Sequence, residues 1–393
     1  MLSRLVSLGR DLARPNAAWL GVAAAVALTW IGIAAIGTVR PDYAAKQARW
    51  LVIGLGGMAA FLLPPPRVLG RWSYAGFVLT IVLLVLLILP GMPRSLVPRI
   101  NAATSWINLG FMNYQPAETA KVFFVLALAW YLRHRESHRF LTGLLPPFVL
   151  MLVPVGLIMK QPDLGSALLF GPTLLIVLVA AGARLRHLGG LVGAGTLVVA
   201  VVAGVTLFAP ENAQILQPHQ QVRIRALFAQ AQGDDRYRLT SAFQQTKAVT
   251  LVGAGGISGH GRDRSGQMIA FNGLPFPYND MIFPVVANRW GLAGSAGVVG
   301  LFLLMVGSFL AVAARARDPF ARLACVGFAA MIFVQAALNV AMCLRLAPIT
   351  GITLPFMSYG GSSLLSSFTM LGLVLNFAAR RERGFTRKSF EFE

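Results

Sequence analysis

Long apolar stretches separated by short polar segments run through most of the chain. Windows such as residues 17–39 and 73–93 contain no charged residue, and they match the roughly 20 residues that a helix needs to cross a bilayer core. The apolar residues are continuous and do not alternate with polar ones, which excludes transmembrane β-strands. The pattern predicts an all-α integral membrane protein.

Ten apolar segments are candidate membrane spans, connected by mostly short loops. They are residues 17–38, 49–64, 73–91, 116–132, 142–160, 164–183, 188–209, 281–313, 320–344 and 356–379. If the N-terminus is cytoplasmic, the inner loops and both tails hold eighteen basic residues and the short outer loops hold seven. This asymmetry satisfies the positive-inside rule, so we expect both termini in the cytoplasm.

The composition supports a membrane protein and argues against other classes. Hydrophobic residues make up 56% of the 393 residues and charged residues only 12%. The net charge of +20 lies in short clusters between apolar segments, as in membrane proteins, so we expect no nucleic-acid partner. We expect residues 1–393 to form a single polytopic domain.

One connection is much longer than the others. Residues 210–280 form a large extracytoplasmic loop between the seventh and eighth spans, far beyond the usual connection length. It contains apolar and aromatic positions and a glycine-rich run at residues 253–261, so we expect an ordered, partly re-entrant structure. No strand precedes the glycine run, which argues against a dinucleotide loop; glycines there permit tight turns or close approach of the backbone to substrate.

Three carboxylates stand at the outer edges of apolar segments, where an ionisable group is costly and is a functional candidate. Glu118 and Asp163 each follow a proline at a predicted helix start, so an ordinary helix-capping role is the alternative for both. Lys121 follows Glu118 by one helical turn and could neutralise Glu118 or Asp163. Asp280 ends the long loop, and no capping requirement explains it.

Four predicted helices begin at the same outer face, at Glu118, Asp163, Asp280 and the serine- and glycine-rich residues 358–363. Helix N-termini carry unpaired N–H groups and the positive ends of helix dipoles. Together they favour an anionic ligand such as a phosphate or pyrophosphate.

Four segments carry a resemblance to a known family. They are residues 115–121 (QPAETAK), 161–167 (QPDLGSA), 279–283 (NDMIF) and 348–364 (PITGITLPFMSYGGSSL). In order and layout they resemble the SEDS family, the FtsW, RodA and SpoVE group of bacterial cell-wall polymerases. The match runs from about residue 100 to the C-terminus, and the last segment is the most specific.

The resemblance implies a peptidoglycan glycosyltransferase in the bacterial cytoplasmic membrane. Its substrate would be lipid II, the undecaprenyl-diphosphate-linked disaccharide peptide, and its partner a class B penicillin-binding protein, with membrane lipids around it. A divalent cation, Mg²⁺ or Mn²⁺, could assist, but the carboxylates specify no metal site, and no organic cofactor is expected. The residues carried over are the catalytic Asp280 and the substrate-binding Glu118, Lys121, Asp163, Ser358, Tyr359, Gly360, Gly361, Ser362 and Ser363.

Two neighbouring positions depart from the family pattern. The family usually has a glutamate pair where this chain has Asn288 and Arg289. An unpaired cation inside a membrane span is costly, so we expect Arg289 to pair with an acid or a phosphate.

The chemistry fits the residues. Helix N-termini and basic side chains would stabilise a leaving diphosphate, while a carboxylate removes the proton from the attacking hydroxyl. One base without a covalent nucleophile inverts the transferred linkage. Two alternatives stay open: a flippase for lipid-linked precursors, which needs polar residues through the full membrane depth, and a non-catalytic division scaffold. The sequence does not distinguish division, elongation and sporulation.

Overall fold

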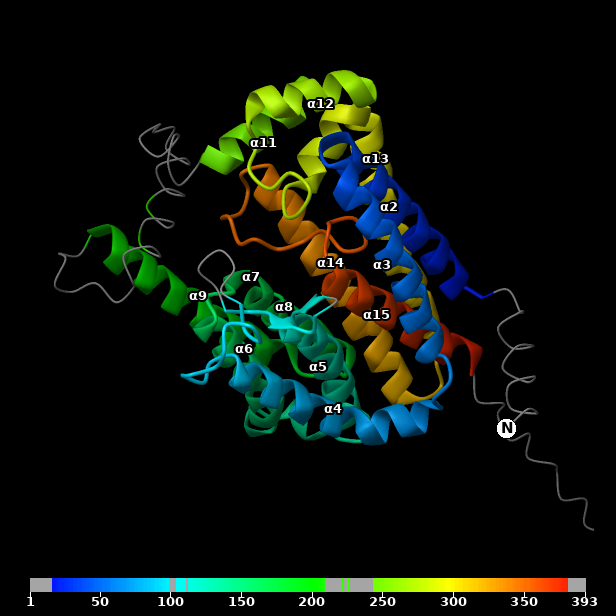
Figure 1. The fold of residues 1–393 in the computed structure, drawn as a ribbon. Helices are drawn as coiled ribbons and strands as arrows, with labels where there is room; N and C mark the ends of the chain where they lie inside the picture. Colours follow the sequence, from blue (N-terminus) through cyan, green and yellow to red (C-terminus); the bar gives the residue numbers. More distant parts are fainter. Residues whose placement is uncertain are drawn as a thin grey trace, which may run out of the picture.

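The computed structural model describes residues 16–98, 104–110, 112–208, 221, 225 and 243–380. The helices are α2 (Ala18–Val39), α3 (Pro41–Ala60), α4 (Pro66–Leu86), α5 (Pro116–Leu132), α6 (Leu145–Lys160), α7 (Leu164–Leu168), α8 (Phe170–Ala180), α9 (Leu185–Phe208), α11 (Phe243–Ala254), α12 (Gly261–Asn272), α13 (Ile282–Arg315), α14 (Pro319–Cys343) and α15 (Gly361–Ala379). Two-residue strands β1 (Ile107–Asn108) and β2 (Asn113–Tyr114) form a small antiparallel hairpin before α5. The arrangement is shown in Figure 1.

The all-α membrane fold is confirmed, and each of the ten predicted segments contains a helix. Within the described residues, seven helices are long and apolar enough to cross a membrane. The other three predicted segments correspond to α3, to α5, and to α7 together with α8. The number of membrane crossings therefore stays a prediction.

The last predicted segment differs from the structure at its start. Residues 356–360 are not helical, and α15 begins only at Gly361. The Ser358 hydroxyl accepts a hydrogen bond from the Leu354 N–H at 2.7 Å, which closes a turn before the helix begins. Ser358, Tyr359 and Gly360 therefore precede the helix N-terminus.

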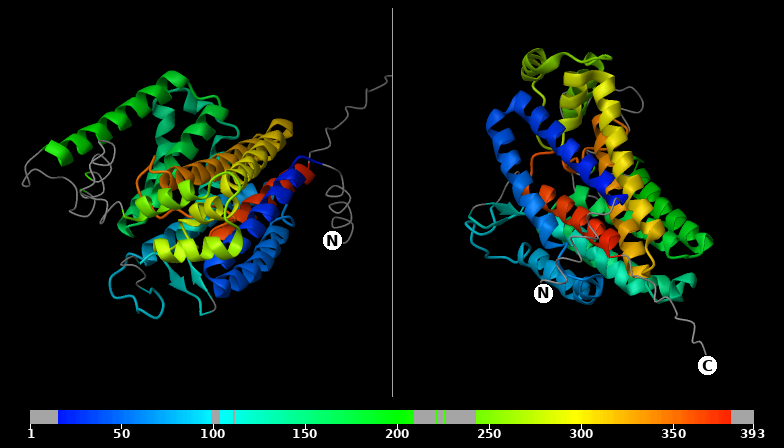
Figure 2. Two further views of the ribbon diagram at one scale, coloured as in Figure 1. Left: turned by 90° about the horizontal axis from the view of Figure 1, so that it is seen from above. Right: turned by 90° about the vertical axis from the view of Figure 1, so that its right-hand side faces the viewer.

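Helix α15 lies at the centre of the bundle, with α3, α2, α5, α13 and α14 packed around it (Figures 1 and 2). Nearly all of its residues are buried. Close approach at two points depends on glycine. A Cβ on Gly372 would meet the Met58 backbone oxygen at 2.5 Å, and a Cβ on Gly32 would meet that of Met357 at 2.5 Å. Small residues at such contacts let helices pack closely in membranes.

Apolar side chains also cover the outside of the molecule, as expected where lipid replaces water. Trp30, Val52 and Leu145 are each more than 60% exposed. Helix α9 extends away from the other helices in all views (Figures 1 and 2), and its side chains are largely exposed.

The described part of the long loop is ordered and helical. Helices α11 and α12 occupy most of residues 243–280 and lie beside α13. Most of residues 209–242 lie outside the described residues, so the full extent and the re-entrant character of the loop stay predictions.

Candidate functional site

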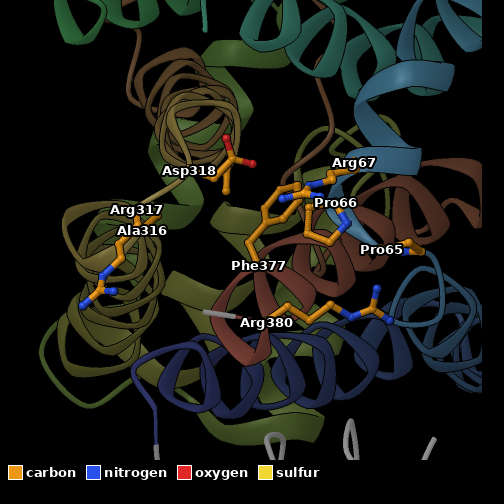
Figure 3. Close-up of a pocket in the computed structure, with 9 residues that line it drawn as sticks. Pro65, Pro66, Arg67, Ala316, Arg317, Asp318, Phe377 and Arg380 are labelled. Atoms are coloured by element: carbon orange, nitrogen blue, oxygen red, sulfur yellow. The ribbon is translucent and has the colours of Figure 1, made fainter. Parts of the chain in front are cut away.

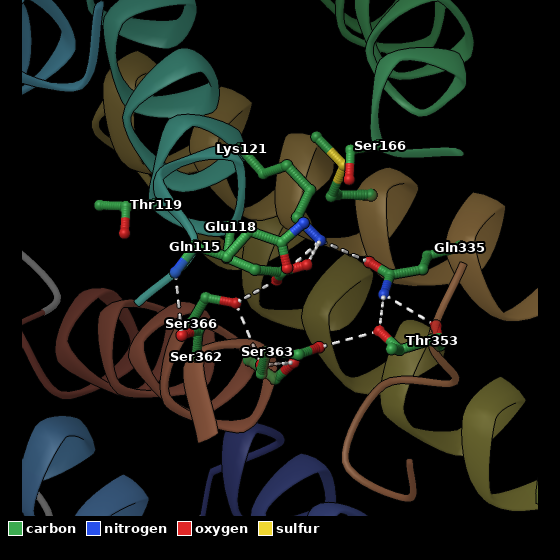
Figure 4. Close-up of polar contacts among 12 residues, drawn as sticks. Gln115, Glu118, Thr119, Lys121, Ser166, Gln335, Thr353, Ser362, Ser363 and Ser366 are labelled. Carbon is green, nitrogen blue, oxygen red and sulfur yellow. Dashed lines mark hydrogen bonds and ion pairs between the residues drawn. The ribbon is translucent and has the colours of Figure 1, made fainter. Parts of the chain in front are cut away.

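A buried ion pair lies at the start of α5. The Lys121 Nζ is 2.8 and 2.9 Å from the two carboxylate oxygens of Glu118. Both side chains are almost fully buried, at 1% and 6% exposure, so each charge depends on its partners. Ser366 on α15 donates to Glu118 at 2.8 Å, and Lys121 donates to Gln335 of α14 at 3.0 Å. Three helices thus meet at this pair (Figure 4).

The network continues from Gln335 to the start of α15. The Gln335 amide donates to the backbone oxygen of Thr353 at 2.9 Å. The Thr353 hydroxyl is 3.0 Å from that of Ser363. Figure 4 shows this chain of contacts from Lys121 to Ser363. The predicted residues Glu118, Lys121 and Ser363 therefore belong to one polar cluster, which we call the α5 cluster.

Asp163 serves as the N-cap of α7, the ordinary role that the sequence left open. Its two oxygens accept from the N–H and the hydroxyl of Ser166 at 3.0 and 2.7 Å. Gln115 donates to Asp163 at 3.0 Å, and its own N–H donates to the Ser362 hydroxyl at 3.1 Å. Burial raises the pKa of the Asp163 carboxyl above its usual range. Asp163 and Ser362 thus lie on either side of Gln115, at the edge of the α5 cluster.

Asp280 lies in a second cluster, at the turn before α13. The Asn339 side chain on α14 donates to the Asp280 backbone oxygen at 2.8 Å. Within the described residues, Gln244 is the one side chain that donates to the Asp280 carboxylate, at a long 3.4 Å. Burial raises the pKa of this carboxyl to about 6. Asp280 thus has a fixed backbone and a buried carboxylate with one long side-chain hydrogen bond among the described residues.

The residues before α15 hold the turn that carries Asp280. The Ser358 hydroxyl donates to the Asn279 backbone oxygen at 2.6 Å, and the Tyr359 N–H donates to that of Tyr278 at 2.9 Å. Ser358 is buried, so its hydroxyl is engaged within the protein. Of the predicted substrate-binding residues, Ser358 and Tyr359 therefore lie in the Asp280 cluster and support its backbone.

The two glycines that follow make different contacts. Gln47 of α3 donates to the Ser358 backbone oxygen at 2.9 Å and accepts from the Gly360 N–H at 3.3 Å. A Cβ on Gly361 would meet the Trp50 ring at 2.5 Å. Gly361 therefore lets α15 begin directly against α3, whereas a Cβ on Gly360 would make only an ordinary contact, with Ser363 at 3.8 Å.

These contacts gather the N-termini of four helices, as expected. Gln115 links the starts of α5, α7 and α15 through Asp163 and Ser362. The Ser358–Asn279 contact links the residues before α15 to those before α13. The uncharged side chains that make this possible were missed from the sequence, because an amide in an apolar segment carries no charge that marks it as a functional candidate. The missed amides are Gln47, Gln115, Gln244, Gln335 and Asn339.

The glycine-rich run packs against a break in α13. Gly291 has a non-helical conformation, φ 67° and ψ −160°, inside α13. The Leu292 N–H donates to the Gly256 backbone oxygen at 2.8 Å, and the His260 N–H donates to that of Asn288 at 3.0 Å. A Cβ on Gly255 would meet the Ala287 backbone oxygen at 2.0 Å. These glycines thus let the backbone of residues 253–261 approach the α13 backbone closely.

No acid is among the hydrogen-bond partners of Arg289 in the described residues, and the expected pairing with a phosphate stays a prediction. Its guanidinium donates to the backbone oxygen of Ala34 at 2.6 Å and to the Thr38 hydroxyl at 2.8 Å, both on α2. It also lies over the Trp290 ring at 4.3 Å. A helix carbonyl, a hydroxyl and an aromatic face thus compensate the cation in place of an acid. Asn288 is buried and donates to the Leu251 backbone oxygen at 3.1 Å, so both residues hold neighbouring helices.

A cation site built from protein side chains alone is not found in the described part of the chain. No three histidine, cysteine or acidic side chains gather there at one point. Glu118 and Asp163 already have strong partners, and Asp280 stands in the other cluster.

Comparison with known protein families identifies the chain. The family model described as "Cell cycle protein", for FtsW, RodA and SpoVE, matches residues 18–383. The chain belongs to the FtsW/RodA/SpoVE family. The resemblance read from the four sequence segments is therefore confirmed.

Members of this family are similar to the chain along most of its length. A probable peptidoglycan glycosyltransferase FtsW of Pseudomonas fluorescens is 32% identical, over 90% of this chain and 86% of its own. Stage V sporulation protein E of Bacillus subtilis is 32% identical over 78% of each chain. A chain from a structure on the coordination of polymerization and crosslinking by a peptidoglycan synthase complex has a TM-score of 0.77 at 30% identity, covering 93% of this chain and 98% of its own. RodA of Thermus thermophilus has a TM-score of 0.66 at 28% identity, covering 93% and 97%.

Proposed function

We propose that this multi-pass membrane protein is a peptidoglycan glycosyltransferase that polymerises lipid II into glycan strands. Its relatives are named for this activity, over most of their length and of this chain. The observation that carries the proposal is the state of Asp280. Its backbone is fixed by Asn339, while among the described side chains only Gln244 donates to its carboxylate, at 3.4 Å.

Asp280 is the proposed general base. A base must accept a proton, and the carboxylates of Glu118 and Asp163 are occupied by Lys121, Ser366, Ser166 and Gln115. A carboxyl with a pKa of about 6 is ionised at neutral pH and basic enough to take a hydroxyl proton. Proton removal from the acceptor sugar hydroxyl by Asp280, without a covalent intermediate, would invert the donor linkage.

The gathered helix N-termini are the proposed diphosphate site. The leaving group carries negative charge, and preorganised N–H groups stabilise such charge without reorganisation. Lys121 keeps the α5 cluster from repelling an anion, because it balances Glu118 with one buried positive charge. Ser362 and Ser363 would bind at the rim of this site. A divalent cation, Mg²⁺ or Mn²⁺, would neutralise charge on the diphosphate of the substrate, and no protein carboxylate is assigned to it.

A similar solved complex supports a protein partner, and the distribution of basic residues supports a membrane location. The similar complex coordinates polymerization with crosslinking, which supports a class B penicillin-binding protein as the partner of this chain. The excess of basic residues on one side supports a bacterial cytoplasmic membrane with both termini in the cytoplasm. The two clusters would then face outward.

The test is a polymerisation assay with purified full-length chain, alone and with a cognate class B penicillin-binding protein. The partner carries an inactivated transpeptidase site, so that products are uncrosslinked strands. Glycan strands made from lipid II by the complex, and not by the partner alone, support the proposal. Lipid II translocation across proteoliposomes without strand formation would favour the flippase, and neither activity would favour the scaffold.

A further inference from the structure

A candidate binding site outside both clusters lies at the opposite end of α14 from Asp280. This pocket, of about 310 Å³, is lined by residues of the α4 start, the α13–α14 turn and the α15 end: Pro65, Pro66, Arg67, Ala316, Arg317, Asp318, Ala321, Phe377 and Arg380. Figure 3 shows Phe377 between the α4 residues and the α13–α14 turn. Nothing in the proposed mechanism uses this pocket.

The length of α14 separates the pocket from the Asp280 cluster. The helix begins next to Asp318 and ends at Cys343, whose sulfur is 3.8 Å from the Asp280 backbone oxygen. Its 25 residues span about 37 Å at 1.5 Å per residue, more than the roughly 30 Å of a hydrocarbon core. With α14 crossing the membrane, the pocket lies towards the membrane face opposite Asp280.

The charges of the pocket favour an anion. Three arginines line it against one carboxylate. Asp318 is engaged as the N-cap of α14, where it accepts from the Phe320 N–H at 3.1 Å. Helix α4 begins at this pocket with Pro65 as its N-cap and no side-chain acceptor there, so its dipole adds positive potential.

The geometry favours a phosphate with an apolar continuation. Arg380 is anchored by donation to the backbone oxygens of Leu62 and Leu63 at 2.9 and 2.6 Å, which fixes one side of the pocket. Arg67 and Arg317 line the pocket with exposed side chains. Guanidinium groups match phosphate oxygens in pairs, while prolines, alanines and Phe377 supply apolar contact. Basic pockets between membrane helices suit anionic headgroups.

We propose that this pocket binds the phosphate of an anionic phospholipid headgroup at the membrane face opposite Asp280. The phosphate contacts Arg67, Arg317 and the α4 N-terminus, and the glycerol lies against Phe377. The site anchors the junction of α4, α14 and α15, so an occupied pocket stabilises the fold independently of the polymerase activity.

The test measures thermal unfolding of the delipidated full-length protein in detergent. Short-chain phosphatidylglycerol, phosphatidylcholine with the same chains, and inorganic phosphate are titrated separately. The pocket variant is Arg67→Gln with Arg317→Gln, which keeps the anchoring Arg380. The matched control is Arg133→Gln with Arg135→Gln, because these arginines lie over the Trp130 and Tyr131 rings outside the pocket.

We expect phosphatidylglycerol to raise the unfolding temperature of the wild type and of the control variant. The apparent affinity of the pocket variant should be at least roughly tenfold weaker, as for loss of charge-assisted hydrogen bonds. Phosphatidylcholine and inorganic phosphate should have little effect at the same concentrations. If phosphatidylglycerol stabilised the pocket variant with the same affinity as the wild type, the proposed site would be overturned. It would also be overturned if the control variant lost as much affinity as the pocket variant. Protection by inorganic phosphate at the lipid's concentration would overturn the lipid headgroup as its ligand.

Discussion

Asn339 donates from its side-chain amide to the backbone oxygen of Asp280 at 2.8 Å, and the same nitrogen lies 2.7 Å from the Ile352 oxygen. One turn earlier on α14, Gln335 contacts Lys121 and Thr353. One face of α14 therefore sets the positions of the turn that carries Asp280 and of the α5 cluster. This explains why uncharged amides sit inside an otherwise apolar helix.

Replacement of Asn339 should uncouple the turn that carries Asp280 from α14. Asn339→Leu leaves the buried oxygens of Asp280 and Ile352 without their donor, which costs about 1–3 kcal/mol each. We expect Asn339→Leu to have a lower thermal stability. We also expect its polymerisation rate to fall even when the rate is normalised to the amount of folded protein. The matched control is Asn376→Leu, because Asn376 makes the same kind of double contact, to Phe61 and Pro64 at 2.7 and 2.8 Å. Loss of activity of equal size in both variants would contradict the positioning role of Asn339.

The pKa of Asp280 predicts opposite pH effects on activity and stability. Burial raises the pKa of this carboxyl from 3.8 to about 6. As pH falls through about 6 the base becomes protonated, so kcat/KM should fall with a slope of one. The folded protein binds this proton more tightly than the unfolded chain, so the group's contribution to stability is fully present below its unfolded pKa and is lost as pH rises through 6.

Asp280→Asn should therefore be at least as stable as wild type above pH 6 and show a flatter stability profile between pH 4 and 6. Thermal unfolding across this range checks the sign. A variant that is less stable than wild type at neutral pH would show that the carboxylate supports the fold and would argue against a free base.

The Glu118–Lys121 pair should show strong coupling. Lys121→Met leaves a buried carboxylate without its cation, which costs about 3–5 kcal/mol. Adding Glu118→Gln should recover most of that loss, since no buried charge remains. A double-mutant cycle in SDS unfolding measures the coupling. Losses that simply add would mean that the two charges do not depend on each other in the membrane.

The glycine-rich run should tolerate alanine at one position and not at another. Gly255→Ala places a Cβ 2.0 Å from the Ala287 oxygen and should lower stability by about 1–3 kcal/mol through overpacking. Gly253→Ala adds a Cβ with nothing within 4 Å, and should be neutral or slightly stabilising in a helix. Thermal unfolding of both variants, with circular dichroism to confirm helix content, measures the contrast.

The sequence predicted the helices and singled out Asp280 as a functional candidate, because both conclusions depend on local features. Apolar runs set the spans, and a carboxylate at the end of a long loop has few neighbours along the chain. The support of the site was not predictable in the same way. Gln47 and Ser358 are 311 residues apart, and Arg289 and Ala34 are 255 apart. Pairing of this kind depends on which helices pack together, and no periodicity in the sequence records it.

The break in α13 shows the same limit. Gly291 lies within a continuous apolar segment and gives no sign of its non-helical backbone. The break is stable because residues 256 and 257 supply acceptors for the N–H groups of Leu292 and Ala293. The sequence shows both glycine positions but not that they meet.

The central claim is that the Asp280 carboxylate is the base of glycan polymerisation. Asp280→Asn preserves the size of the side chain but cannot accept the proton, so the rate should fall by about 10²- to 10⁴-fold. The matched control is Asp263→Asn, an exposed acid in the first turn of α12, which should polymerise normally. The measurement is the initial rate of strand formation from lipid II by each folded variant with its penicillin-binding partner. The account predicts near-complete loss for Asp280→Asn with folding and partner binding unchanged; a rate near wild type would contradict it.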